Sequence, residues 1–67
     1  MNSDKMVTTW QDQILVECER IMQRPLTKAE TSFVRNRKGF LALEMMEDSV
    51  ATMARSELLA YLNSDRG

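Results

Sequence analysis

The chain has 67 residues, with nine basic side chains, ten acidic side chains and no histidine, so its net charge at neutral pH is −1. A single domain of this length buries only about 60% of the surface that its unfolded chain exposes. Cys18 is the only cysteine, which excludes an intrachain disulfide, and the absence of histidine excludes a Cys/His zinc site and any catalytic dyad or triad that uses histidine. A lone thiol also favours a reducing compartment, and we therefore expect a cytoplasmic protein.

The composition predicts an all-α fold, because two glycines and one proline stand among many strong helix formers. We expect a single domain over residues 1–67, in which 1–8 and 64–67 are loosely ordered. No apolar run is long enough to cross a bilayer, so we expect no membrane partner. The domain is predicted to be a compact bundle of three helices, with four as an alternative, and the three lie near residues 10–23, 28–47 and 50–63.

The first helix is predicted from an apolar stripe with spacings of three and four residues, which is typical of an amphipathic helix. Thr9 precedes the stripe and can accept a hydrogen bond from the first helical turn. We interpret Trp10 as a core anchor at the helix start and place Gln11 on a solvent-facing side. The stripe consists of Trp10, Ile14, Cys18 and Ile21, widened by Leu15 and Met22.

The start of the second helix has the clearest local signal in the chain. Pro25 disfavours helix in the residue before it. Thr27 can then cap a new helix, and Glu30, three residues later, can reach back to the Thr27 amide. This capping box predicts a helix that begins directly after Thr27.

The end of the second helix depends on Gly39. Basic residues just before this glycine indicate a last helical turn with a glycine cap. The apolar pairs Phe33–Val34 and Phe40–Leu41, however, are seven residues apart, which places both pairs on one face of a continuous helix. We follow the apolar pattern and predict a helix over 28–47 that passes through Gly39.

A continuous helix would place Arg37 in the middle of an apolar face. In one interpretation its stem lies on the phenylalanines and its head stays in water or pairs with a carboxylate. In another, Arg37 anchors an interface and pairs with an acidic group on a partner chain. A helix break at Gly39 would remove the conflict.

The segment from Phe40 to Met46 is apolar on nearly all sides, and such a helix needs burial on more than one side. It is either the central helix of the bundle or a surface for a partner, including a second copy in a homodimer. We predict a small non-enzymatic protein–protein interaction module, an adaptor or regulator, that binds through the helix face between Phe33 and Met46. The predicted partner-binding residues are Phe33, Arg37, Phe40, Leu41, Met45 and Met46.

The third helix is predicted near 50–63, after a joint at Asp48 and Ser49, because either residue can cap a helix start. Ser56-Glu57 offers a second start. An apolar stripe also runs through the joint at helical spacing, so we expect a kink or a tight turn there. That stripe consists of Leu43, Met46, Val50, Ala54, Leu58 and Leu62.

The sequence contains no catalytic fingerprint and no glycine-rich phosphate loop. Glu44, Glu47 and Asp48 lie within about one helical turn and could hold a hard cation, but three carboxylates without a loop scaffold are a weak site. We interpret them as a solvated acidic patch. No catalytic residue, metal or cofactor is therefore predicted, and an enzyme is not expected.

Charge is distributed unevenly along the chain. Residues 20–38 carry a net charge of +5, whereas 1–19 and 39–67 each carry −3. This pattern indicates either charge complementarity between packed helices or a site for an anionic partner. The alternative function is thus a small nucleic-acid-binding regulator that uses the basic segment Arg20–Lys38. On a continuous second helix its contact residues share a face opposite Phe40, and they are Lys28, Arg35 and Lys38.

Overall fold

The computed structural model describes residues 2–64, and helices account for most of that range. Between residues 2 and 64 it contains no strand, so the predicted all-α bundle is confirmed, in its four-helix form. None of these helices is long and apolar enough to span a bilayer. The helices are α1 (Asn2–Met22), α2 (Lys28–Arg35), α3 (Phe40–Ala51) and α4 (Arg55–Leu62).

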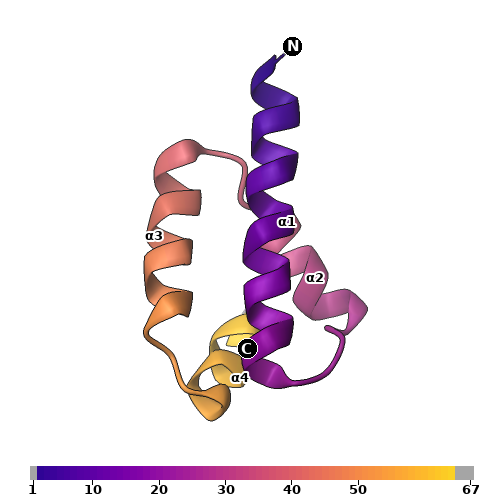
Figure 1. The fold of residues 1–67 in the computed structure, drawn as a ribbon, viewed down its shortest axis with the longest axis vertical. Coiled ribbons are helices and arrows are strands. Elements are labelled where there is room, and N and C mark those ends of the chain that lie inside the picture. The colour runs from indigo at the N-terminus through magenta and orange to yellow at the C-terminus, as the bar shows by residue number, and fades with distance from the viewer. Residues whose placement is uncertain (1, 65–67) are drawn as a thin grey trace.

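The long helix α1 is the centre of the fold, and it contacts each of the other three helices. In Figure 1, α3 lies along one side of α1, α2 lies on the other side, and α4 lies near the C-terminal end of α1. The helix begins at Asn2, so the expectation of a loose segment is wrong for residues 2–8. Val7 lies seven residues before Ile14, and it extends the core-facing stripe of α1 toward the N-terminus. Of the expected loose tail at 64–67, Ser64 donates a hydrogen bond to the Tyr61 carbonyl over 2.8 Å, and 65–67 lie outside the described residues.

All four helices contribute to one hydrophobic core. Cys18 is fully buried there as a free thiol, and burial raises its pKa to about 11. The thiol is therefore protonated at neutral pH and acts as a small core side chain. The core consists of Ile14, Cys18, Met22, Phe33, Val34, Leu43, Met46, Val50, Leu58 and Leu62.

The joint between α1 and α2 follows the local signals. Gln23 ends α1 in the left-handed region, with φ of 60°, and its amide donates to the Glu19 carbonyl over 2.8 Å. The predicted capping box is confirmed. The Glu30 amide donates to Thr27 Oγ1 over 3.2 Å, and the Thr27 amide donates to Glu30 Oε1 over 2.9 Å.

The prediction of one helix over 28–47 is wrong, because α2 ends at Arg35 and α3 starts after Gly39. Gln11 explains where α2 ends. It is buried, not solvent-facing as predicted, and its side-chain nitrogen donates to the Arg35 carbonyl over 3.1 Å and also to the Arg37 carbonyl. These carbonyls lie at a helix end, where they need donors from outside the helix. The break also lets α2 and α3 pack on different sides of α1 (Figure 1).

The predicted joint at Asp48 and Ser49 is also wrong, because α3 continues to Ala51. The next helix starts at Arg55 and not near 50, one residue before the alternative start at Ser56-Glu57. Glu57 Oε1 accepts a hydrogen bond from the Ala54 amide over 2.9 Å, which satisfies one amide at that start. Ala54 is exposed at the turn, whereas the other members of the predicted stripe are buried, namely Leu43, Met46, Val50, Leu58 and Leu62.

Candidate interaction surface

Five of the six predicted partner-binding residues separate into a buried and an exposed group, and the sixth, Arg37, is half-buried. Phe33 and Met46 lie in the core, so they are not available to a partner in this fold, and their assignment to a surface is corrected. Phe40, Leu41 and Met45 are exposed by 48%, 69% and 61%. The face from Phe33 to Met46 was predicted as one surface of one helix, and the break at residues 36–39 divides it.

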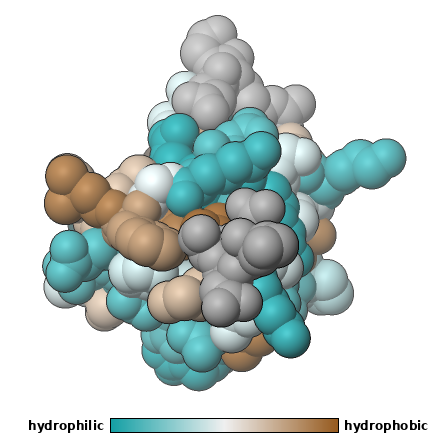
Figure 2. All heavy atoms as spheres, turned by 90° about the horizontal axis from the view of Figure 1, so that it is seen from above, coloured by the Kyte–Doolittle hydropathy of each residue, from teal (hydrophilic) through white to brown (hydrophobic). Residues whose placement is uncertain are grey.

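The exposed residues of α3 form two neighbouring stripes. Phe40, Glu44 and Glu47 follow one another at spacings of four and three residues, so they share one stripe. Leu41, Met45 and Asp48 repeat this spacing on the next stripe. Figure 2, seen from the N-terminal end of α1, shows apolar side chains gathered on the side of the molecule where α3 lies.

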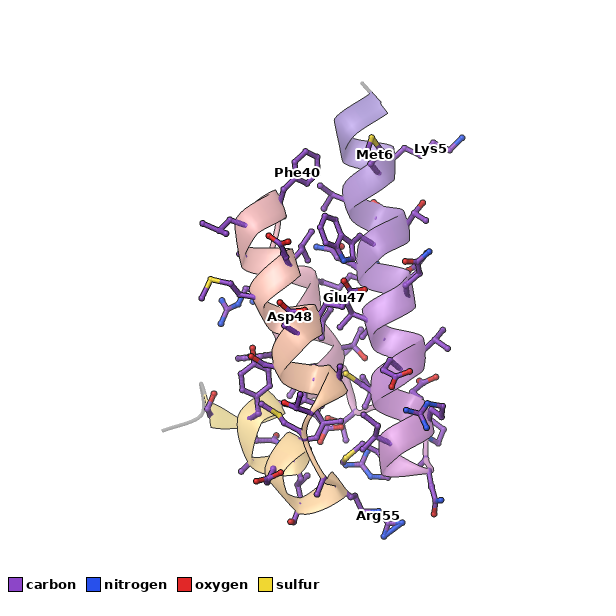
Figure 3. The ribbon with its side chains drawn as sticks, turned by 60° about the vertical axis from the view of Figure 1, so that its left-hand side comes forward. Lys5, Met6, Phe40, Glu47, Asp48 and Arg55 are labelled. Atoms are coloured by element: carbon purple, nitrogen blue, oxygen red, sulfur yellow. The ribbon has the colours of Figure 1, made fainter. Side chains whose placement is uncertain are left out.

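Phe40 continues the apolar surface onto α1. Its ring stacks on Trp10, with 6.0 Å between the ring centroids and 28° between the ring planes. Trp10 packs against the core, as predicted, but it also lines an open hollow of about 620 Å³ together with Met6. Figure 3 shows Met6 and Phe40 at the same end of the molecule. We call the following residues the exposed apolar surface: Met6, Trp10, Phe40, Leu41 and Met45.

A second hollow adjoins the first between α1 and α3. It has a volume of about 240 Å³ and shares the lining residue Gln13 with the first hollow, which residues of α1 line. We call the two neighbouring hollows, together with Phe40 beside Trp10, the α1–α3 groove. Ile14 and Val50 lie at its base, while Glu17 and Glu47 line it from the two helices. The groove is therefore apolar at its Trp10 end and acidic farther along.

Three acidic side chains on α3 have no ion-pair partner among residues 5–64. Within residues 5–64, no ion pair or hydrogen bond engages the side chains of Glu44, Glu47 or Asp48. Figure 3 shows Glu47 and Asp48 on α3 below Phe40. The same part of the chain contains no group of three residues placed to hold a metal ion. Glu47, with Glu44 on the same stripe, instead gives the α3 side of the groove a negative charge.

Three of the six cations in the basic segment, in contrast, form ion pairs within the chain. Arg20 bonds Glu17, Arg24 bonds Glu30, and Arg35 Nη2 lies 2.7 Å from Asp12 Oδ1. The sequence left charge complementarity between packed helices and an external partner open. Of the three pairs, Arg35–Asp12 joins two helices, whereas Arg20–Glu17 lies within α1 and Arg24 lies in the loop before α2.

The three residues predicted to contact nucleic acid do not share a helix face, because α2 ends at Arg35 and Lys38 lies in the following loop. Arg35 is held by Asp12 and also approaches Gln11 Oε1 at 3.4 Å. Lys28 is exposed at the first residue of α2, while Lys38 borders a separate hollow beside Thr8 and Gln11.

Arg37 contacts its own chain. The guanidinium carbon lies 4.7 Å from the centroid of the Phe33 ring, in cation–π geometry. The residue is half-buried in the loop between α2 and α3. This position matches the interpretation in which the arginine stem lies on a phenylalanine, and the helix break removes the conflict that the sequence posed.

Glu30 is the most heavily bonded side chain in the fold's interior. Both Arg24 amino groups donate to its two oxygens over 3.0 Å, and Asn63 Nδ2 donates to Oε2 over 3.0 Å. The carboxylate is only 2% exposed, and the Arg24 guanidinium, with help from the Thr27 amide and Asn63, lowers its pKa to about 2. Glu30 thus joins the ends of α1, α2 and α4.

The sequence did not predict the roles of two residues, Met6 in the exposed apolar surface and Gln11 at the end of α2. Met6 was assigned to the loose segment, although its spacing of four residues from Trp10 places it on the same helical stripe. Gln11 has no local signal, because its role depends on carbonyls more than twenty residues away in the chain. Comparison of the chain with protein-family models, curated proteins and solved structures finds no significant match.

Proposed function

We propose that this protein is a small non-enzymatic protein–protein interaction module, an adaptor or regulator, that binds its partner through the exposed apolar surface. The observation that carries the proposal is the exposure of Phe40, Leu41 and Met45 on one helix, of which Phe40 stacks on Trp10 of α1. Apolar side chains gathered on one part of a small protein are typical of a contact site for another protein. Methionine and aromatic residues are also common at such sites.

The core of the domain is complete without Leu41 and Met45. The inner stripe of α3, with Leu43, Met46 and Val50, already packs on α1, and each of these residues is at most 1% exposed. Burying Leu41 and Met45 against a partner would add favourable apolar area, which is worth about 25 cal/mol per Å². Exposed apolar residues that do not serve the fold therefore support a binding role.

Charge favours a different chain over a second copy as the partner. In a two-fold dimer the same patch faces itself, so two copies of α3 would meet. Each copy would bring Glu44, Glu47 and Asp48, and α3 contains no basic residue to pair with them. Like charges placed together oppose association. A homodimer stays a prediction, with this repulsion against it.

Nucleic-acid binding has weaker support. Arg35 is already paired with Asp12, which leaves Lys28 and Lys38 on different parts of the surface. The exposed apolar surface adjoins unpaired carboxylates, which repel phosphates.

The buried, free Cys18 agrees with a reducing compartment, and a cytoplasmic location is part of the proposal.

Differential capture by surface variants tests the proposal. The wild type, Phe40→Ser/Leu41→Ser and a matched control, Val16→Ser/Leu59→Ser, would be immobilised and exposed to lysate, and retained proteins would be quantified by mass spectrometry. Val16 and Leu59 are exposed apolar residues outside the proposed surface. We expect proteins that the wild type and the control retain to be lost by Phe40→Ser/Leu41→Ser, with circular dichroism showing that all three are folded.

Light scattering on the same three proteins covers the case of a second copy. A mass above 7.8 kDa that falls to the monomer value only in Phe40→Ser/Leu41→Ser would identify the partner as the chain itself. If this variant alters neither the retained proteins nor the mass, the exposed apolar surface does not bind a protein and the proposal is overturned.

A further inference from the structure

The α1–α3 groove has two chemically different ends along one line. On α1, the residues Met6, Trp10, Gln13 and Glu17 follow at spacings of four, three and four, so they form one stripe that runs from the apolar end to the acidic end. At about 1.5 Å per residue this stripe is roughly 16 Å long, which equals three helical turns. The groove therefore has the length of a short docked helix.

The opposite side of the groove repeats the order. Phe40 stacks on Trp10 at the apolar end, and Glu44 and Glu47 follow on the same stripe of α3. Glu47 lines the second hollow across from Glu17. Glu17 is neutralised by Arg20, whereas no cation within residues 5–64 pairs with Glu44 or Glu47. One basic side chain, Lys5, borders the apolar end.

We infer that the occupant of the α1–α3 groove is a cationic amphipathic helix from another protein. This inference rests on the proposed function and names the chemistry of its partner. An apolar side chain of that helix packs against Trp10 and Phe40, and a lysine or arginine one to two turns later faces Glu44 and Glu47. Amphipathic helices bind in hydrophobic grooves through anchors with this spacing, and complementary charge sets their orientation.

Charge complementarity favours a cationic helix over three other occupants of the groove: a second copy of the chain, a nucleic acid and a neutral helix. A second copy would present its own acidic α3 to Glu44 and Glu47, and a nucleic acid would present phosphates to them. A neutral amphipathic helix would fill the apolar end but leave the two carboxylates without partners. Only a cationic helix satisfies both ends of the groove.

The test uses a designed peptide of about 18 residues, which is roughly 27 Å long as a helix. It carries leucine on one face and lysine on the other, and it lacks tryptophan. A second peptide replaces each lysine with glutamate, and a third has the composition of the first in scrambled order. Trp10 is the only tryptophan of the protein, so its fluorescence reports binding at the apolar end, and calorimetry measures the affinity.

We expect the lysine peptide to shift Trp10 emission and to bind roughly tenfold or more tightly than the other two peptides. Glu44→Gln/Glu47→Gln should weaken its binding about tenfold, and high salt should reduce the affinity of the wild type toward that of the variant. The matched control is Asp12→Asn/Glu19→Gln, which removes two charges on the other side of α1, where Asp12 bonds Arg35 and Glu19 bonds the Leu26 amide. This control should bind nearly as tightly as the wild type.

Each other outcome identifies what has failed. Equal binding of the lysine and glutamate peptides, lost in Phe40→Ser/Leu41→Ser, would overturn the cationic partner and leave the proposed function standing. Equal binding of the lysine and scrambled peptides would show charge attraction without docking and would overturn the groove assignment. No binding of any peptide would also overturn the inference, and the capture experiment would then decide separately whether the exposed apolar surface binds a different kind of protein.

Discussion

Two apolar pairs of nearly the same composition, Phe33–Val34 and Phe40–Leu41, differ in burial: the first is buried and the second is exposed. The first pair is buried on α2, and its members are 4% and 0% exposed. The second pair stands at the start of α3 and is about half exposed or more. The pairs are seven residues apart, so on one straight helix they would have shared a face.

The polar groups around the two pairs differ in the same way. Near the first pair, Glu30 is buried and accepts hydrogen bonds from Arg24, Thr27 and Asn63. Near the second pair, Glu44 and Glu47 are exposed and unpaired within residues 5–64. The joint between α1 and α2 is thus closed and fully satisfied, which is typical of a region that maintains the fold. The α1–α3 groove leaves its apolar and charged groups available for another molecule.

Glu30→Ala should have the largest effect on folding. Its removal deletes the acceptor of several buried hydrogen bonds and half of the capping box, so we expect a loss of roughly 3 kcal/mol in the free energy of unfolding. Glu47→Ala is the matched change in the groove and should alter stability by less than about 0.5 kcal/mol. Urea unfolding followed by circular dichroism measures both, and similar losses in the two variants would contradict the contrast between the joint and the groove.

The charge-dependent part of the Glu30 effect should appear as a pH dependence. The folded pKa of Glu30 is about 2, below its ordinary value of 4.5, so its carboxylate contributes its full stabilisation above that ordinary value. The contribution is lost as the pH falls through this window toward 2. The difference in the free energy of unfolding between the wild type and Glu30→Gln should therefore shrink on acidification. The other carboxylates titrate in both proteins, so their effect cancels in this difference. Urea unfolding over this pH range measures the difference, and a constant value would show that the charge of Glu30 does not stabilise the joint.

Gln11→Ala should have an intermediate effect at the point where the chain turns from α2 to α3. Its removal leaves the carbonyls of Arg35 and Arg37 without their side-chain donor, at a cost of about 1–2 kcal/mol. Gln13 lies two residues away on the exposed side of α1, so Gln13→Ala should hardly change the stability. Thermal unfolding of the two variants tests whether Gln11 holds the break in place, and equal melting temperatures would argue that it does not.

Gln23→Gly should have the smallest effect, and it should be stabilising. Gln23 has a left-handed backbone that glycine adopts without steric cost, so we expect a gain of roughly 0.5–1 kcal/mol after the added freedom of the unfolded chain is counted. Gln13→Gly, in the middle of α1, should instead lose about 1 kcal/mol. Opposite shifts of the melting temperature are the expected result, whereas a loss in both variants would mean that the Gln23 contact with Arg55 outweighs the backbone strain.

Local features of the sequence determined the helical class and several boundaries. Pro25, Thr27 and Glu30 specify the start of α2 through short-range sterics and hydrogen bonds, and the structure agrees. The apolar spacing also identified most of the core, because residues on one stripe of a helix are buried together whatever helix they face. These signals act within a few residues, so they can be found without knowledge of the fold.

The tertiary structure alone decided which apolar residues between Phe33 and Met46 are buried and where α2 ends. Gly39 is compatible with both a helix interior and a helix start, and the choice depends on Gln11 of α1, which satisfies the carbonyls at the end of α2. Once the chain turns there, α3 presents Leu43 and Met46 to α1 and leaves Leu41 and Met45 outside. A segment that is apolar on nearly all sides has no preferred inward face of its own, so the position of α1 selects which side is buried and which side is left for a partner.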